Sequence, residues 1–307
     1  MPRKKHIVLV VHGARAERPD LRHMVSWVRD RGHLVELCVT WDPGDAAAFA
    51  SNAADRGVDV VVAVGGDGTL NEVVNGLDGR DTPLGVVPLG TANDFARQIG
   101  VPADADHAMD VVLLKEPLRM DTASLNGRRF VNVSSGGVGA EATAETPTQA
   151  KATLGALAYA ITGVRKIAGF APYRGRFRGN GVSRDDDFSL DGEFLLFGVG
   201  NGRATGAGTL LTPQASVTDG LIDVCVVEAM PRREFGRLLL KFKRGEQIGQ
   251  SGVHYAQVRS LVIEADAPLS VNVDGEHATL DRMDYRARPS DLWVYAAHLP
   301  GEEVPPP

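Results

Sequence analysis

The sequence has little cysteine, no long apolar run and no excess of positive charge. Its two cysteines, Cys38 and Cys225, lie far apart without metal-ligand spacing, which predicts buried, reduced thiols in a cytosolic protein. The longest uncharged run of interest, 152–164, is shorter than the roughly 20 residues of a membrane-spanning helix. The apolar part of the N-terminus, 7–11, is too short for a signal peptide and predicts a first buried strand. Any contact with a membrane is therefore expected at the surface of the bilayer, without a segment that spans it.

The formal net charge of −6 argues against a nucleic-acid binder that gains its affinity by neutralising phosphates. An anionic partner would have to meet a local basic patch. One candidate is the stretch 163–179, GVRKIAGFAPYRGRFRG, where basic residues alternate with Phe170, Tyr173 and Phe177 and no acid occurs. Such a mixture is typical of a segment that contacts an anionic membrane, and a solvated basic strand or loop is the alternative.

The length of 307 residues favours two domains. The first third alternates strand and helix patterns, which predicts a parallel sheet covered on both faces. From about Asp121, short apolar runs separated by turn residues predict an antiparallel sandwich or barrel-like domain. The expected domains are 1–120, completed by 287–307, and 121–286. The expected helices are 19–31, 45–56, 73–77, 92–100 and 106–115, with helical insertions at 148–166 and 230–250.

Two expected strand-to-helix junctions share one pattern: 68–72 reads Gly-Thr-Leu-Asn-Glu and 90–94 reads Gly-Thr-Ala-Asn-Asp. In both, the threonine is placed to cap the helix, and the acid is placed to close a capping box or to favour the helix dipole. That explanation needs no ligand. It leaves unexplained the density of glycine around Asp67, because glycine costs backbone entropy that a simple turn does not require.

Ligands of doubly wound sheets bind outside the carboxyl ends of the strands, where both junctions would lie. If the junctions are neighbours, two helix N-termini and a bare glycine backbone converge on one spot, which would attract a polyphosphate. No lysine stands where a P-loop carries it. Asp67 would repel the phosphates unless a divalent cation lay between them, so the pattern predicts a nucleotide bound with Mg²⁺.

The combination of GGDGT and PLGTANDFAR resembles the diacylglycerol kinase catalytic domain family of lipid and sphingoid-base kinases, and is most similar to its bacterial YegS-like lipid kinases. The resemblance extends to VTWDPGDAA, ETPTQAKATLGALAY, GNGRATGAGTLLTPQASVTDGLIDV and VNVDGE, and so covers most of the chain. It implies an N-terminal α/β nucleotide-binding domain followed by a C-terminal antiparallel β-sandwich domain, with the active site in the interdomain cleft.

The resemblance also implies site residues. A second divalent site is implied, bound partly through backbone carbonyls, with Mg²⁺, Ca²⁺ or another divalent ion as candidates and a merely structural cation as the alternative. The residues implied for ATP are Thr40, Gly66, Asp67, Gly68, Thr69, Leu70, Asn71, Glu72 and Thr91, with Asn93 and Asp94 shaping the pocket, and those implied for the second cation are Ser216, Asp219 and Leu221. One departure is His12, where many relatives carry asparagine; we assign it no role.

Glu276, in VNVDGE, occupies the general-base position of the family. Taken alone, Asp274-Gly275 predicts an ordinary hairpin turn. With the resemblance, Glu276 is expected to take the proton of a lipid hydroxyl as the γ-phosphoryl group transfers.

The function expected from the sequence is an ATP- and Mg²⁺-dependent lipid kinase, with phosphatidylglycerol or diacylglycerol as candidate acceptors, located in the cytoplasm at the inner membrane face. One alternative is a kinase of a soluble substrate, of the NAD kinase type. Another is a non-catalytic regulator that binds nucleotide or lipid, which loss of Asp67, Asp219 or Glu276 would have indicated; all three are present.

Overall fold

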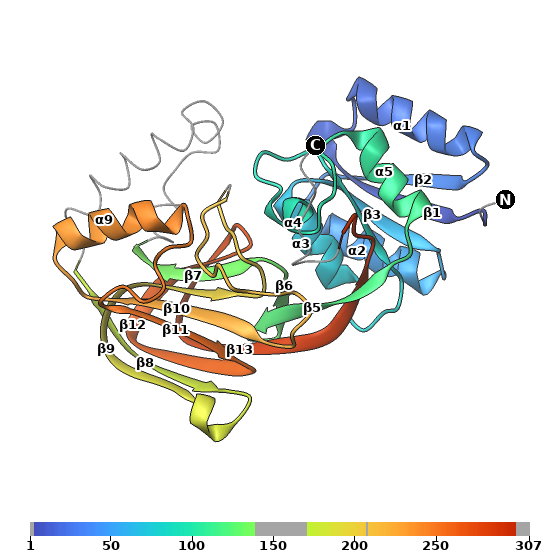
Figure 1. Ribbon diagram of the computed structural model, residues 1–307. Helices are drawn as coiled ribbons and strands as arrows, with labels where there is room; N and C mark the ends of the chain where they lie inside the picture. Colours follow the sequence, from blue (N-terminus) through green and yellow to red (C-terminus); the bar gives the residue numbers. More distant parts are fainter. Residues whose placement is uncertain (1–2, 139–170, 207, 299–307) are drawn as a thin grey trace. The chain divides into compact units, whose positions relative to one another are not determined.

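The computed structural model describes residues 3–138, 171–206 and 208–298 (Figure 1). The chain forms two compact units: unit 1 is Met1–Thr122 with Pro289–Pro307, and unit 2 is Ala123–Arg288. Two strands carry the chain from one unit to the other, β5 (Leu118–Leu125) and β13 (Glu276–Val294). None of the helices in the described ranges is long and apolar enough to cross a membrane. The helix expected at 148–166 lies outside these ranges.

Unit 1 is a doubly wound α/β domain. Its parallel strands run in the order β4-β3-β1-β2, and the end of β13 adds to β4 where Val294 pairs with Leu84. Helices α2 and α3 pack together on one face and α1 packs with α5 on the other, which explains why β3 and β4 are apolar and buried throughout. The bounds are β1 His6–His12, η1 Gly13–Arg15, α1 Pro19–Asp30, β2 Leu34–Thr40, α2 Asp45–Asp55, β3 Val60–Gly65, α3 Asp67–Gly76, β4 Leu84–Pro88, α4 Asp94–Gln98 and α5 Ala105–Leu114.

Unit 2 is antiparallel and β-rich. Its two long strands, β9 and β12, each pair with β7 along one part of their length and with β8 along another, so these four strands form a closed ring. Phe177, Phe194 and Phe197 lie together in the core of this unit with edge-to-face ring contacts. The bounds are β6 Arg128–Phe130, β7 Val133–Gly137, β8 Tyr173–Asn180, η2 Arg184–Asp186, β9 Phe188–Gly200, β10 Ile222–Glu228, α9 Arg232–Phe242, β11 Val253–Val258 and β12 Ser260–Val273.

The helix expected at 230–250 is shorter than predicted. It is α9, which ends at Phe242 and packs Phe235, Leu238 and Phe242 on a second apolar core. The rest of the segment turns, with Gly245 and Gly249 at φ +70° and +78°, a conformation that ends a helix.

The helix starts at the two glycine junctions also differ from the prediction. Helix α3 begins at Asp67 after the N-cap Gly66, well before the expected 73, and α4 begins at Asp94 after Asn93, whose φ is +49°. Neither helix has a side-chain cap, so the expectation that Thr69 and Thr91 cap them was wrong. The reason is positional: Thr69 already lies inside α3, and Thr91 precedes the N-cap of α4.

The described part of the basic stretch, 171–179, leads into and forms most of β8. Along this strand Arg174, Arg176 and Arg178 are exposed, whereas the residues between them point inward. Phe177 is 0% exposed, so the expectation that it would meet a membrane interface was wrong. The alternation of a strand places it in the core, and the remainder of the stretch, 163–170, lies outside the described residues.

Two helical glycines predict opposite responses to alanine. A Cβ on Gly76 would lie 2.3 Å from the carbonyl oxygen of Ala47, a backbone atom of the helix packed against α3. We expect Gly76→Ala to destabilise the protein by about 1–3 kcal/mol. A Cβ on Gly236, in the interior of α9, would meet nothing within 4 Å, so Gly236→Ala should stabilise it by about 1 kcal/mol. Urea denaturation of both variants checks this, and equal shifts would contradict it.

Candidate active site

The predicted nucleotide residues of unit 1 lie at the carboxyl ends of its parallel strands. β1 is followed in the chain by β2 on one side and has β3 on its other side, so the strand order reverses at β1. At the end of β2, the Thr40 hydroxyl accepts a hydrogen bond from the Gly13 backbone N–H at 3.4 Å. A Cβ on Gly13 would lie 2.4 Å from the Thr40 carbonyl oxygen, so only glycine allows this approach. Thr40 therefore lies against the first loop, at the edge where α/β sheets bind ligands.

His12 has a role that the sequence did not reveal. Its Nδ1 accepts a hydrogen bond from the Ala14 backbone N–H at 3.2 Å, which caps the short helix η1. His12 thus holds the loop that contacts Thr40.

The two glycine junctions are direct neighbours, as the nucleotide hypothesis requires. A Cβ on Gly90 would lie 2.5 Å from the Gly66 Cα, and the Leu89 backbone N–H donates to the Gly65 carbonyl at 2.7 Å. Packing therefore accounts for Gly66 and Gly90 without a ligand. Gly68 is different, because it is exposed and a Cβ there would meet nothing within 4 Å. Of the glycines around Asp67, Gly68 leaves open backbone at the start of α3.

Asn93 fixes the second junction. Its side-chain Oδ1 accepts from the Gly90 N–H and its Nδ2 donates to the Gly90 carbonyl, both at 3.0 Å. This pair of hydrogen bonds closes the loop around Thr91, which is exposed. Asp94, at the start of α4, is buried.

The Asp67 carboxylate lies between the starts of the two helices. Burial raises its pKa, and the negative charge of Asp94 raises it further, while the backbone N–H groups of Phe95, Asn93 and Asp94 oppose the rise. Within the part of the chain that the structure describes, its Oδ1 is buried and has no hydrogen-bond partner. A buried carboxylate oxygen without a donor is rare and is explained if the group holds a cation.

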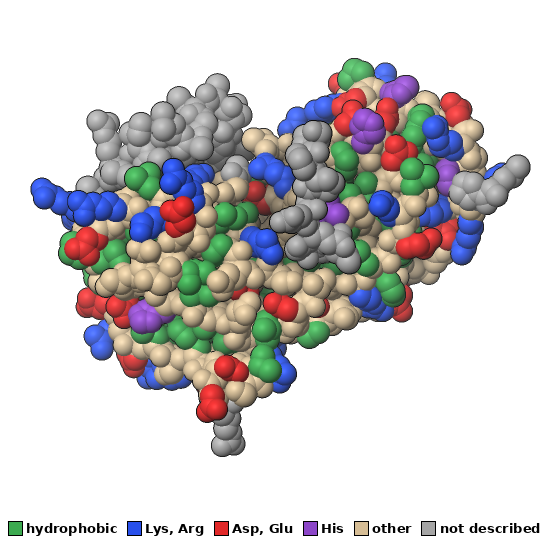
Figure 2. Space-filling model, in the orientation of Figure 1, with side chains coloured by type: hydrophobic (Ala, Val, Ile, Leu, Met, Phe, Trp, Pro, Cys, Tyr) green, Lys and Arg blue, Asp and Glu red, His purple; other side chains and the backbone are tan. Residues whose placement is uncertain are grey.

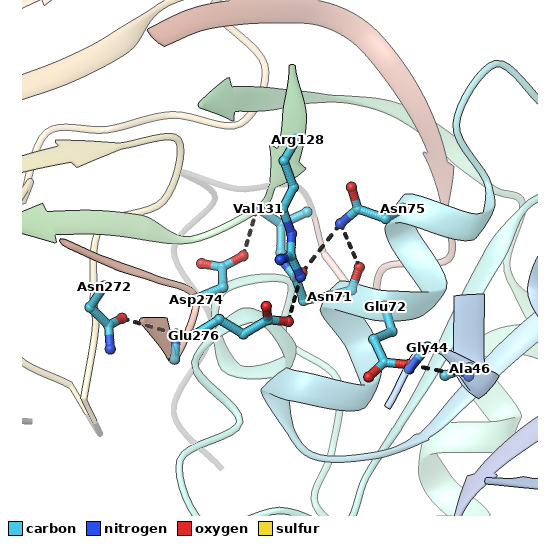
Figure 3. Close-up of polar contacts among 11 residues, drawn as sticks. Gly44, Ala46, Asn71, Glu72, Asn75, Arg128, Val131, Asn272, Asp274 and Glu276 are labelled. Carbon is cyan, nitrogen blue, oxygen red and sulfur yellow. Dashed lines mark hydrogen bonds and ion pairs between the residues drawn. The ribbon is translucent and has the colours of Figure 1, made fainter. Parts of the chain in front are cut away.

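The next predicted residues along α3 are mainly packing groups. Thr69, Leu70 and Asn71 are buried, and Asn75 Nδ2 donates to the Asn71 carbonyl at 2.9 Å. Glu72 accepts from the backbone N–H groups of Gly44 and Ala46 at 3.0 and 3.2 Å (Figure 3). The expectation that Glu72 closes a capping box on its own helix was therefore wrong, because its carboxylate satisfies the start of α2 instead.

In unit 2, Glu276 follows a two-residue hairpin turn. Asp274 and Gly275 have φ values of +48° and +95°, as in a type I′ turn, and Gly275 N donates to Asn272 Oδ1 at 3.0 Å. The Glu276 carboxylate forms an ion pair with Arg128 at 2.5 Å (Figure 3). The prediction that Asp274-Gly275 forms a hairpin turn is therefore confirmed. The hairpin presents the half-exposed carboxylate of Glu276, which the guanidinium of Arg128 orients.

Asp274 does more than form the turn. Its buried carboxylate accepts hydrogen bonds from three consecutive backbone N–H groups, those of Val131, Asn132 and Val133, at 2.8, 3.1 and 3.2 Å. These contacts fasten the Glu276 hairpin to the start of β7 and the two residues before it (Figure 3). Sequence reasoning missed this role, because its donors lie some 140 residues earlier in the chain.

The residues predicted for a second cation share one turn of unit 2. Asp219 Oδ1 accepts from the Leu221 N–H at 3.0 Å, and the Ser216 hydroxyl lies 3.1 Å from that of Thr218. In the described ranges, no group of three or more His, Cys, Asp or Glu side chains is placed to hold a metal ion. A cation here would therefore depend on Asp219 and on backbone carbonyls.

A partly buried hydrogen-bond network centred on Asp223 is tied to the segment that leads into this turn. Burial raises the pKa of Asp223 to about 6, against hydrogen bonds from Tyr255 and Gln257 that lower it, and Asp219 adds to the rise. The Tyr255 hydroxyl donates to Asp223 Oδ1 at 2.5 Å and accepts from the Gln214 N–H at 3.1 Å. The strand β10 is thus tied to the segment that precedes Ser216.

A cavity of about 140 Å³ lies at the start of α9, lined mainly by apolar side chains and by Arg232. Ligand pockets usually measure about 300–1,000 Å³, so this cavity is too small for a lipid. Its lining residues are Val138, Pro172, Leu195, Ala229, Met230, Arg232 and Phe235.

Comparison with known proteins identifies both units. Residues 6–125 match the diacylglycerol kinase catalytic domain, and residues 132–296 match the YegS C-terminal NAD kinase beta sandwich-like domain. A protein of Xanthomonas oryzae pv. oryzae named "Probable lipid kinase YegS-like" is 39% identical over 309 residues, 97% of each chain. A protein of the same name from Pseudomonas aeruginosa is 38% identical over 300 residues, 97% of this chain and 95% of its own. The chain belongs to the YegS-like lipid kinases.

The fold is shared with more distant proteins. A crystal structure of a diacylglycerol kinase from Bacillus anthracis superposes with a TM-score of 0.71 at 20% identity, covering 96% of this chain and 98% of that one. Another structure from that organism reaches a TM-score of 0.78 at 22% identity over the same share of each chain. The two-domain prediction, an α/β domain followed by a β-rich domain, is confirmed.

As a YegS-like lipid kinase, the chain is an enzyme that uses ATP and a divalent metal, as this kinase family does in general. The residues of unit 1 fit both groups. The open backbone at Gly68 and the helix start at Asp67 suit phosphate groups, and the buried Asp67 oxygen without a donor suits the metal.

The raised pKa of Asp67 predicts that replacing its carboxylate by a neutral amide stabilises the protein in a pH-dependent way. Because its pKa is raised in the folded state, the ionised form costs stability above that pKa, and the cost vanishes as pH falls below the ordinary carboxyl value of about 4. We expect Asp67→Asn to be more stable than the wild type at pH 7 and to lose this advantage near pH 4. Denaturation at both pH values measures it.

The same variant should lose phosphoryl transfer on the order of 100-fold, and ATP with Mg²⁺ should stabilise the wild type but not the variant. Asp110→Asn, on α5, is the matched control and should alter neither property. An Asp67→Asn variant that is less stable than the wild type at pH 7 would contradict the electrostatic account.

Asp274 and Glu276 predict a separation of stability from activity. Asp274→Ala leaves three buried N–H groups without their acceptor and should destabilise the protein by about 3 kcal/mol, with Asp274→Asn intermediate because its amide oxygen still accepts. Glu276→Gln should leave stability within about 0.5 kcal/mol and lower the turnover at least 100-fold. Denaturation and kinase assays on the same preparations test this, and a fully stable Asp274→Ala would refute the role of Asp274.

Proposed function

We propose that this YegS-like lipid kinase transfers the γ-phosphoryl group of ATP, bound with Mg²⁺, to a hydroxyl group of a membrane lipid. The observation that carries the proposal is the contact between the two glycine junctions of unit 1, with Asp67 between the starts of α3 and α4. Such a convergence of helix starts favours a polyphosphate, and an acid at its centre favours a cation between carboxylate and phosphate.

The residues of unit 1 would bind and orient the nucleotide. The backbone around Gly68 would approach the phosphates, Thr40 and Thr91 would contact the nucleotide at neighbouring strand ends, and Asp67 would hold the cation. Mg²⁺, when bound, neutralises charge on the phosphates as the γ-phosphoryl group transfers. The packing of Leu70 and Asn71 would keep the start of α3 in place.

Glu276 would act as the general base. A lipid hydroxyl is a weak nucleophile, and removal of its proton by a carboxylate assists attack on phosphorus. Arg128 would orient the Glu276 carboxylate through their ion pair, and Asp274 would fix the hairpin on which it stands. The turn at Ser216, Asp219 and Leu221 would hold a second divalent cation, Mg²⁺ or Ca²⁺.

The acceptor would be a lipid such as diacylglycerol or phosphatidylglycerol. The names of the relatives, a lipid kinase and a diacylglycerol kinase, support a lipid acceptor without naming which one this chain uses. A soluble acceptor such as NAD is the second candidate, favoured by the NAD kinase-like description of the family that matches unit 2. We place the enzyme in the cytoplasm, at the anionic inner face of the membrane.

Transfer of labelled γ-phosphate from ATP tests the proposal. The acceptors are diacylglycerol, phosphatidylglycerol, a sphingoid base, ceramide and NAD, each with Mg²⁺ and with Ca²⁺, and Asp67→Asn and Glu276→Gln serve as inactive controls. We expect labelled lipid with the wild type and on the order of 100-fold less with either variant. Transfer to NAD alone would overturn the lipid assignment, and full activity of Glu276→Gln would overturn the base. No transfer to any acceptor would favour a regulator.

A further inference from the structure

Helix α9 and the turn after it carry an unusual concentration of positive charge. Between 231 and 246, six basic residues stand against two acidic ones, a local net charge of +4 in a chain whose total is −6. We call the six the α9 basic cluster. Figure 2 shows Lys and Arg side chains gathered on the surface where Figure 1 places α9. The cluster consists of Arg232, Arg233, Arg237, Lys241, Lys243 and Arg244.

The helix sorts its residues into two faces. Phe235, Leu238 and Phe242 are buried in the core of unit 2. Arg233, Arg237 and Leu240 lie at spacings of four and three residues, which puts them on one stripe pointing away from that core. Leu240 is 72% exposed. The outward stripe thus combines cations with one large apolar side chain.

The α9 basic cluster lacks carboxylate partners within the described part of the chain. Among the residues that the structure describes, none of its six side chains forms an ion pair with a carboxylate, and Lys241 donates to the uncharged Gln250 at 2.6 Å. No carboxylate of the described ranges therefore offsets the field of these cations through an ion pair.

Two arginines of β8, unlike the α9 basic cluster, form ion pairs with acids. Arg174 pairs with Asp266 at 3.8 Å and Arg176 with Glu264 at 3.4 Å, and Glu264 also binds Arg282. The neighbouring strand β9 adds Asp191 directly opposite Arg176. The described part of the stretch that is most basic by sequence thus places Arg174 and Arg176 beside acids, which reduces the field of these two arginines.

We propose that the outward face of α9 is the surface by which this protein docks on an anionic lipid bilayer. The cations of the α9 basic cluster lie at the headgroups, and Leu240 enters the boundary with the acyl chains. Basic residues and an exposed apolar side chain on one helix face are the features of helices that lie in a membrane interface. The inference rests on the proposed lipid acceptor, and it moves the membrane contact from β8 to α9.

Co-sedimentation with vesicles tests the surface. The vesicles are phosphatidylcholine alone or phosphatidylcholine mixed with phosphatidylglycerol, and the variant is Arg233→Gln, Arg237→Gln and Arg244→Gln together. Each basic residue near an anionic surface is worth about a fivefold change in partitioning, so the triple variant should bind the mixed vesicles on the order of 100-fold less. Leu240→Gln should weaken the binding that remains at high salt, where charges are screened.

The matched control removes the same charge from β8: Arg174→Gln, Arg176→Gln and Arg178→Gln. It should bind nearly as well as the wild type. Unfolding midpoints of both triple variants verify that they are folded. The inference is overturned if the wild type does not bind the mixed vesicles, if the α9 variant binds as the wild type does, or if the β8 variant loses as much.

A kinase assay separates this inference from the proposed function. With a short-chain diacylglycerol dispersed in uncharged detergent micelles, the α9 triple variant should retain the turnover of the wild type, whereas on mixed vesicles its rate should fall with its binding. If the wild type phosphorylates no lipid in either format, the proposed function fails while the docking surface stands on co-sedimentation. Equal loss of activity by the α9 variant in micelles would overturn docking as its role.

Discussion

The close approach of two glycine backbones is the constraint on which the candidate nucleotide site depends. Gly66 and Gly90 lie so near each other that a Cβ on Gly90 would be 2.5 Å from the Gly66 Cα. This contact brings together the ends of β3 and β4 and, with them, the starts of α3 and α4. The half-buried Asp67 lies between those starts as a consequence, and desolvation and the charge of Asp94 raise its pKa. The packing of the two junctions requires Gly66 and Gly90, and the raised pKa of Asp67 follows from that packing.

The acids of unit 2 differ from Asp67 in that donors satisfy them. Where unit 1 leaves an Asp67 oxygen without a donor, unit 2 gives Asp274 three backbone N–H groups and gives Glu276 an arginine. An acid satisfied by fixed donors is a structural anchor, whereas an acid left unsatisfied or held at the surface is available for chemistry. This difference distinguishes Asp274 from its neighbour Glu276, although both belong to one hairpin.

In β8 and α9, the net charge counted along the sequence differs from the net charge of the residues that surround each segment in the fold. β8 contains no acid within its own stretch, yet Arg174 and Arg176 pair with Asp266 and Glu264 of β12. α9 has an acid in its own sequence, Glu234, but its basic side chains form no ion pair with a carboxylate of the described residues. Strand pairing brings acids that are distant in the chain next to β8. Packing of one face of α9 brings no carboxylate of the described residues into an ion pair with its cations.

The sequence by itself determined the fold class and the two glycine junctions, because apolar periodicity and glycine turns are local properties that the chain displays directly. It indicated the family through the resemblance of its motifs. Only the tertiary structure decided what the individual side chains do. Glu72 satisfies α2 rather than its own helix, and Phe177 is in the core. Asp274 anchors residues far away in the chain. Each of these contacts joins elements that are distant in sequence, and no local pattern encodes which partners the fold will bring together.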